Sequence, residues 1–146
     1  MAFTGNVTTN AFIVGMPSGL YNFATGTSDV YKIALYTNAA TLNATTAVYT
    51  DVGEVAPSSV YTATGNVLTV NQVPTTGATG NISYWSFDDA TWSGAITARG
   101  ALIYKVSGGT VCVLDFGSDK TSTTTFTVRF PSSTNTSAII RISYAN

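Results

Sequence analysis

The sequence predicts an all-β fold, arranged as a single-domain antiparallel β-sandwich of jelly-roll type or as a closed barrel. Roughly eight to ten short segments rich in strand-forming residues are separated by Gly, Pro, Asn and Asp, which favour turns. Threonine, which suits a pleated surface with one wet face, occurs 26 times, and no segment supports a helix of three turns. At 146 residues, with no internal repeat and no linker, residues 1–146 are expected to form a single β domain.

Residues 1–26 differ from the rest of the chain because glycines and a proline interrupt them repeatedly. Two short apolar runs, residues 11–14 and 20–23, lie between these breaks. We expect short strands there or, for residues 1–26 as a whole, a loop-rich N-terminal arm that orders on contact with a partner.

Residues 30–37 carry the first strong strand signal, because both of their alternating faces are largely apolar. This pattern predicts a central strand, followed at residues 38–47 by a loop or one short helical turn. Two apolar runs flank Gly108 and Gly109, which predicts a β-hairpin of residues 101–105 and 110–116 with a short connection whose glycines are able to adopt positive φ angles. Further strands are expected at residues 60–63, 66–72, 81–87, 95–104, 125–130 and 137–144.

Charge is scarce, since only 9% of residues are charged and the formal net charge is −1. Hydroxyl and amide side chains supply polarity instead, so little electrostatic repulsion keeps copies apart. We therefore expect much of the surface to be covered in an assembly, and expect a homo-oligomer, either a dimer or a trimer.

The charge pattern and the apolar runs also bear on the classes of partner. The six basic residues are scattered singly, which predicts no nucleic-acid binding. No run approaches the roughly 18 apolar residues of a membrane span, so no membrane association is expected. Residues 1–4 lack the pattern of a secretory signal, which favours synthesis in the cytoplasm.

Histidine is absent from the sequence, and this excludes Ser-His-Asp, Cys-His and His-metal sites by inventory. The carboxylate pairs that remain are Asp88 with Asp89, Asp115 with Asp119, and Asp51 with Glu54. Adjacent carboxylates on a strand point to opposite faces, so a solvated turn is favoured at residues 88–89. A calcium site is the alternative, although the spacing of a calcium loop is missing. We expect no enzyme, and no catalytic, cofactor-binding or metal-binding residues.

Arg99 lies within an otherwise apolar strand, and the predicted hairpin brings it close to Asp115. If its side chain points inward, an ion pair with Asp115 or Asp119 is expected, because an unpaired buried cation is costly. The alternatives are an outward Arg99 at a subunit interface and a contact with a ligand.

The single cysteine and the aromatic residues are expected to serve packing. Cys112 lies in an apolar run without a histidine to activate it, which predicts a buried structural thiol. Tyr84, Trp85 and Trp92 are the candidates for a sugar-stacking platform. Core packing is favoured over that role, because Tyr84 and Trp85 alternate within one strand and one of them must face inward.

Three stretches of the sequence carry a resemblance to a known family. Residues 31–38 read YKIALYTN and precede an Ala/Thr tract, residues 96–104 read ITARGALIY, and residues 113–121 read VLDFGSDKT. As a set these blocks resemble a family of small virion proteins of tailed bacteriophages, over most of the chain from about residue 30 onwards. Residues 1–26 do not share the likeness.

The resemblance implies a structural virion protein made in the host cytoplasm. Within the virion it favours a capsid decoration, or cement, protein that binds the outside of the major capsid lattice and stabilises it. The alternatives are a tail or fibre-associated module and a carbohydrate-binding β-sandwich that contacts the host surface.

Overall fold

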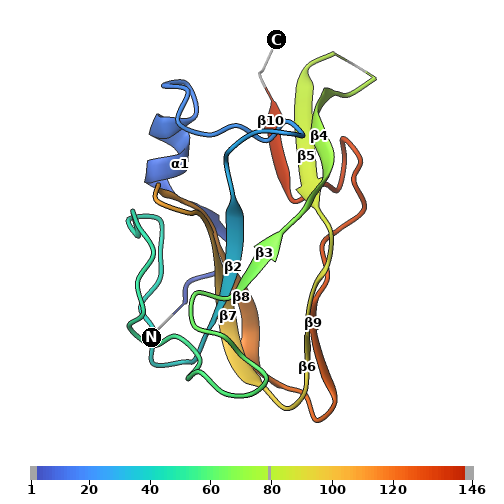
Figure 1. The fold of residues 1–146 in the computed structure, drawn as a ribbon. Coiled ribbons are helices and arrows are strands. Elements are labelled where there is room, and N and C mark those ends of the chain that lie inside the picture. Colours follow the sequence, from blue (N-terminus) through green and yellow to red (C-terminus); the bar gives the residue numbers. More distant parts are fainter. Residues whose placement is uncertain (1–2, 79, 144–146) are drawn as a thin grey trace.

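Two layers of antiparallel β-strands pack face to face in the structure, a computed structural model that describes residues 3–78 and 80–143 (Figure 1). The all-β prediction is confirmed, and the arrangement is that of a sandwich. The strands of the described residues close no barrel.

The first layer is a five-stranded sheet in which the two longest strands, β7 and β8, form the predicted hairpin. Its spatial order is β1 (Val7–Thr8), β8 (Thr110–Thr121), β7 (Thr97–Lys105), β2 (Tyr31–Tyr36) and β3 (Asn66–Leu68). The positive φ of the hairpin turn falls on Ser107, at 58°, although Gly108 and Gly109 follow it and could adopt such an angle.

The second layer consists of two smaller sheets arranged end to end. The upper sheet has the order β10 (Ile140–Ser143), β5 (Ile82–Phe87) and β4 (Val70–Thr76). The lower sheet pairs β6 (Ala90–Ser93) with β9 (Thr125–Val128). Because only Asp88 and Asp89 separate β5 from β6, these two strands follow one another along the layer (Figure 1).

Strand β2 is buried on both faces, as its two apolar faces predicted. Ile33 and Leu35 belong to the main core between the layers. Ala34 and Tyr36 face the other way, into a second core that also contains Phe3. The loop between β2 and β3 supplies Leu42 to this second core, so loop residues cover the outer face of the first layer.

Residues 3–26 are rich in loops, as predicted, but they are packed into the core and do not form a free arm. Residues 10–15 form a short helix, α1 (Asn10–Gly15), and not the strand expected at residues 11–14. The Thr9 hydroxyl caps this helix by accepting a hydrogen bond from Phe12 N at 3.3 Å. Phe12 is 2% exposed, and its ring lies 5.0 Å from that of Tyr21. Phe23 is also buried, so three aromatic side chains fasten the segment to the sandwich.

Several predicted boundaries change. Residues 60–63 form no strand, because Ser58 caps a turn there with its hydroxyl, which accepts from Val60 N and Tyr61 N at 3.1 Å each. Residues 20–23 form no strand, whereas residues 38–47 form loops and turns, in line with the predicted loop. Strand β8 runs on to Thr121, whereas β10 is shorter than predicted, and the last residue of that prediction, Tyr144, lies outside the described residues.

Candidate interaction surface

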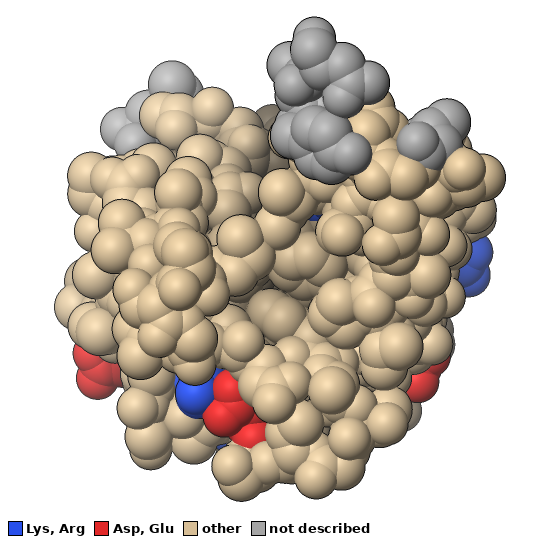
Figure 2. Space-filling view, turned by 90° about the horizontal axis from the view of Figure 1, so that it is seen from above, with Lys and Arg blue, Asp and Glu red and all other residues tan. Residues whose placement is uncertain are grey.

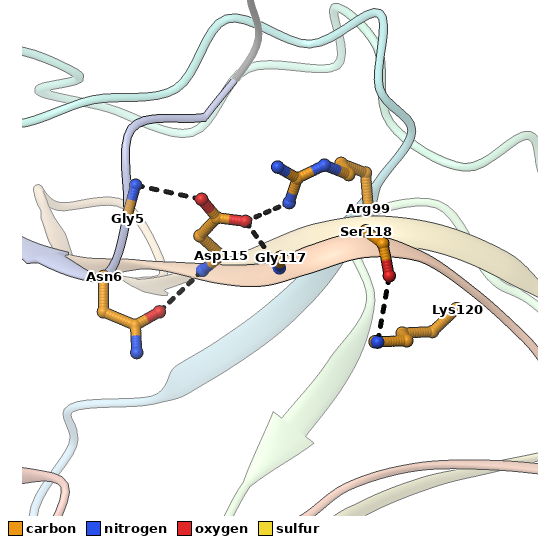
Figure 3. A network of polar contacts seen from close by, with 7 residues as sticks. All are labelled: Gly5, Asn6, Arg99, Asp115, Gly117, Ser118 and Lys120. Atoms are coloured by element: carbon orange, nitrogen blue, oxygen red, sulfur yellow. Dashed lines mark hydrogen bonds and ion pairs between the residues drawn. The ribbon is translucent and has the colours of Figure 1, made fainter.

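The Arg99 guanidinium and the Asp115 carboxylate form the predicted ion pair between β7 and β8 (Figure 3). The carboxylate also accepts hydrogen bonds from Gly5 N at 2.9 Å and Gly117 N at 2.8 Å. In return, Asp115 N donates to the side-chain oxygen of Asn6 at 2.7 Å. The network therefore joins the hairpin strands β7 and β8 to the N-terminal segment, which is distant from them in sequence.

The register around the ion pair explains its position. Gly100 pairs with Asp115 and Ala98 with Lys120, so residues 116–119 bulge beside Arg99. The guanidinium holds the pKa of the Asp115 carboxyl below its usual range. Both carboxylate oxygens already accept hydrogen bonds from within the protein, so this network serves to hold the fold together. Asp119 is not part of the pair, and instead accepts from Asn38 Nδ2 at 3.3 Å.

The remaining candidate carboxylates lie in turns and loops. Asp88 and Asp89 are exposed at the turn between β5 and β6, as predicted, and Asp89 accepts from Phe130 N at 2.9 Å. Asp51 is exposed in the loop between β2 and β3. Within residues 3–78 and 80–143, no group of three or more metal-ligating side chains is placed to hold an ion.

Glu54 forms a polar cluster that the sequence did not predict. One carboxylate oxygen accepts from the Tyr61 hydroxyl at 2.6 Å and from Thr64 N at 2.8 Å, while the other accepts from the Tyr49 hydroxyl. The Tyr61 hydroxyl in turn accepts from Leu35 N at 2.9 Å, and burial raises the pKa of this phenol. The cluster fastens the loop between β2 and β3 to the first layer. No periodic pattern links these residues, so no sequence signal identified them.

The cysteine and both tryptophans belong to the core, as predicted. Cys112 is 7% exposed, and burial raises the pKa of its thiol to about 12. Trp85 and Trp92 are each 3% exposed, and Tyr84 is half-buried. The three candidate stacking residues therefore form no exposed platform.

The exposed surface combines sparse charge with scattered large apolar side chains. Seen from the end where α1 and β10 lie, the surface is almost entirely uncharged, with the few charged side chains near its rim (Figure 2). The large apolar residues at least 38% exposed are Ile13, Val14, Leu20, Val30, Val48, Val52, Val67, Val106 and Ile142. Apolar side chains scattered singly are common on protein surfaces, so the scarcity of charge is what distinguishes this one.

One flank of the sandwich is open. On this flank the edge of the first layer, made by β1 and β8, faces the outer strands β9 and β10 of the second layer. A groove of about 410 Å³ runs between β8 and β9. We call it the β9 groove; it is lined by Phe116, Lys120, Thr121, Ser122 and residues 125–129. Two further grooves lie beside β10 and share Thr8, Ile140, Arg141 and Ser143 in their linings. One of them also contacts Phe12 and Ile13 of α1.

Comparison with known protein families, with curated proteins and with solved structures found no match for this chain. Among the described residues, no helix has the length and apolar character needed to cross a bilayer.

Proposed function

We propose that this chain is a structural virion protein of a tailed phage, and that it decorates the outside of the major capsid lattice and stabilises it. The observation that carries this proposal is the surface itself, which combines sparse charge, exposed large apolar side chains and open strand edges. A surface of this kind supports affinity through apolar contact and backbone pairing, and neither requires catalytic side chains.

The sequence resemblance supports the same proposal, and its three blocks fall on one part of the fold. Residues 31–38 contain β2, residues 96–104 contain most of β7, and residues 113–121 form the C-terminal part of β8. These strands are neighbours in the first layer, and the Arg99–Asp115 ion pair joins two of them. The three blocks therefore form the interior of the first layer, and we expect a partner to contact the edges of the layers instead.

The mechanism follows from linkage. A protein that binds only the assembled lattice stabilises that lattice, because disassembly must also break the added contacts. A dimer or trimer of this chain would bridge several capsid subunits at once and raise the cost of separating them.

The test is the copy number of this chain in purified particles relative to the major capsid protein. We expect hundreds of copies on the head, and we expect heads stripped of the protein to break at a lower temperature until it is added back. A few copies that co-purify with isolated tails would reject the decoration role and support the tail-associated alternative. The carbohydrate-binding alternative is weakened, because Trp85 and Trp92 lie in the core and are not exposed to stack against a sugar.

A further inference from the structure

The β9 groove runs along a strand edge and not across a strand face. Its lining includes five consecutive residues, 125–129, although neighbouring side chains of a strand point to opposite faces. A cavity over one face would contact only alternate residues. In the described chain β9 pairs with β6 alone, so its other edge carries backbone groups without a strand partner. The groove therefore exposes an edge that can accept a further strand.

Two cations lie at the rim of this groove, and neither forms an ion pair in the described chain. Lys120 and Arg129 line the groove, and no carboxylate does. The ion pairs among the described residues use neither of them, and Lys120 Nζ contacts only the hydroxyl of Ser118, at 3.0 Å. Asp119, next to Lys120 in the sequence, accepts from Asn38 Nδ2 at 3.3 Å. Asp89 lies close to Arg129, because its carboxylate accepts from Phe130 N at 2.9 Å, but the two side chains form no ion pair in the described chain. The rim is therefore suited to an acidic partner.

The floor of the groove is apolar. Phe126 is 6% exposed, and its ring lies 6.2 Å from that of Phe116. Along β9 the side chains of Phe126 and Val128 point inward, whereas Thr125, Thr127 and Arg129 point outward. A strand added to this edge would alternate in the same way, so its inward residues should be apolar and some of its outward residues acidic.

We propose that the β9 groove binds an extended acidic segment of the capsid protein, which adds to β9 as an extra strand. The origin of that segment rests on the proposed function, whereas its chemistry follows from the groove. A second copy of this chain is the poorer occupant, because two such grooves would each bring positive charge and no carboxylate to the shared surface.

Titration of the full chain with a synthetic peptide tests the chemistry of the groove. The probe is a peptide of about eight residues that alternates Val and Glu, and the matched control replaces each Glu with Lys. We expect the acidic peptide to shift the backbone amide signals of residues 125–129 and to slow hydrogen exchange at alternate amides, as strand addition requires. Equal binding of both peptides, or shifts confined to other residues, would overturn the proposal.

Two matched variants test the charge. Arg129→Glu reverses a cation at the groove, and Arg141→Glu makes the same change at an exposed position on β10. We expect Arg129→Glu to weaken binding of the acidic peptide by about fivefold or more and Arg141→Glu to leave it within about twofold. Because both residues are exposed, both variants should keep the unfolding midpoint of the wild type. Equal affinity of the two variants would contradict the role of the rim.

Capsids lacking the protein separate this inference from the proposed function. If the wild type and Arg129→Glu occupy such capsids equally, the inference fails and the decoration role stands. If neither binds capsids while the acidic peptide still binds the wild type at residues 125–129, the decoration role fails and the groove keeps its assigned chemistry.

Discussion

At the scale of single residues, Asp115 holds three segments together through one carboxylate. It accepts from Arg99, Gly5 and Gly117, and each of these donors loses a charged acceptor when the carboxylate is removed. Arg99 also lies over the Phe3 ring, with its guanidinium carbon 5.4 Å from the ring centre. Because Phe3 belongs to the second core, this contact connects the ion pair to that core.

Replacing Asp115 with Asn should destabilise the fold by about 1–2 kcal/mol at pH 7, because charge-assisted hydrogen bonds become neutral ones. The pKa of Asp115 is lowered in the folded state, so its stabilisation is present above the unfolded pKa of about 4 and is lost as the pH falls through the folded value. Urea unfolding at pH 7 and at about pH 2 measures this, and the gap between variant and wild type should shrink in acid. Asp88→Asn, at an exposed turn, serves as the control, and a gap that widens in acid would contradict the prediction.

Cys112 should resist thiol reagents in the folded protein. It is 7% exposed, and burial raises the pKa of its thiol to about 12, so almost no thiolate is present at neutral pH. Labelling with a disulfide reagent at pH 8 should be slow without denaturant and complete in urea. Rapid labelling of the native protein would show that the strand carrying Cys112 opens readily.

At the scale of elements, α1 converts a glycine-rich segment into part of the core. Phe12 packs against the rings of Tyr21, Phe23 and Trp85, whereas its neighbour Ile13 is 55% exposed. Phe12→Ala should cost about 3–5 kcal/mol, and Ile13→Ala should stay within about 0.5 kcal/mol. Denaturant unfolding of the two variants measures the difference. Equal small effects would mean that residues 3–26 behave as the free arm that their composition predicted.

The loop between β2 and β3 depends on the hydroxyl of Tyr61. This group donates to Glu54 and accepts from Leu35 N, and Tyr61 is fully buried. Tyr61→Phe keeps the ring but leaves both partners short of a hydrogen bond, which should cost about 1–3 kcal/mol. Hydrogen exchange should show faster opening at Leu35 N and Thr64 N than in the wild type. Thr62→Ala, at an exposed position of the same loop, should leave exchange unchanged.

Elements with a local, repeating pattern could be predicted, and those defined by tertiary contacts could not. Strand β2 and the β7–β8 hairpin follow from apolar alternation and turn residues. The helix α1 did not, because its six residues are too few to show helical periodicity and Thr9 alone marks its start. Strand β6 could not be predicted either, because Asp88 and Asp89 favour a turn that ends a strand, whereas pairing resumes directly after them.

At the scale of the whole molecule, the candidate surfaces depend on which strands lie at the edges of each layer. The ion pair of Arg99 with Asp115 could be predicted because a hairpin fixes which residues face each other. The β9 groove could not, since it needs strand order, and strand order depends on contacts between segments far apart in sequence. Residues 125–129 alternate cleanly in the sequence, but alternation does not tell an edge strand from a central one.

The scarcity of charge also determines how the whole molecule should respond to salt. The ion pairs of the described residues are Arg99 with Asp115 and Lys105 with Asp29, and the formal net charge is −1, so screening has little attraction or repulsion to remove. We expect the thermal midpoint to change by less than about 3 °C between low salt and about 1 M NaCl. Sodium sulfate should raise it, because excluded salts strengthen apolar burial. A fall of more than about 5 °C in NaCl would show that its few charges contribute far more to stability than their number predicts.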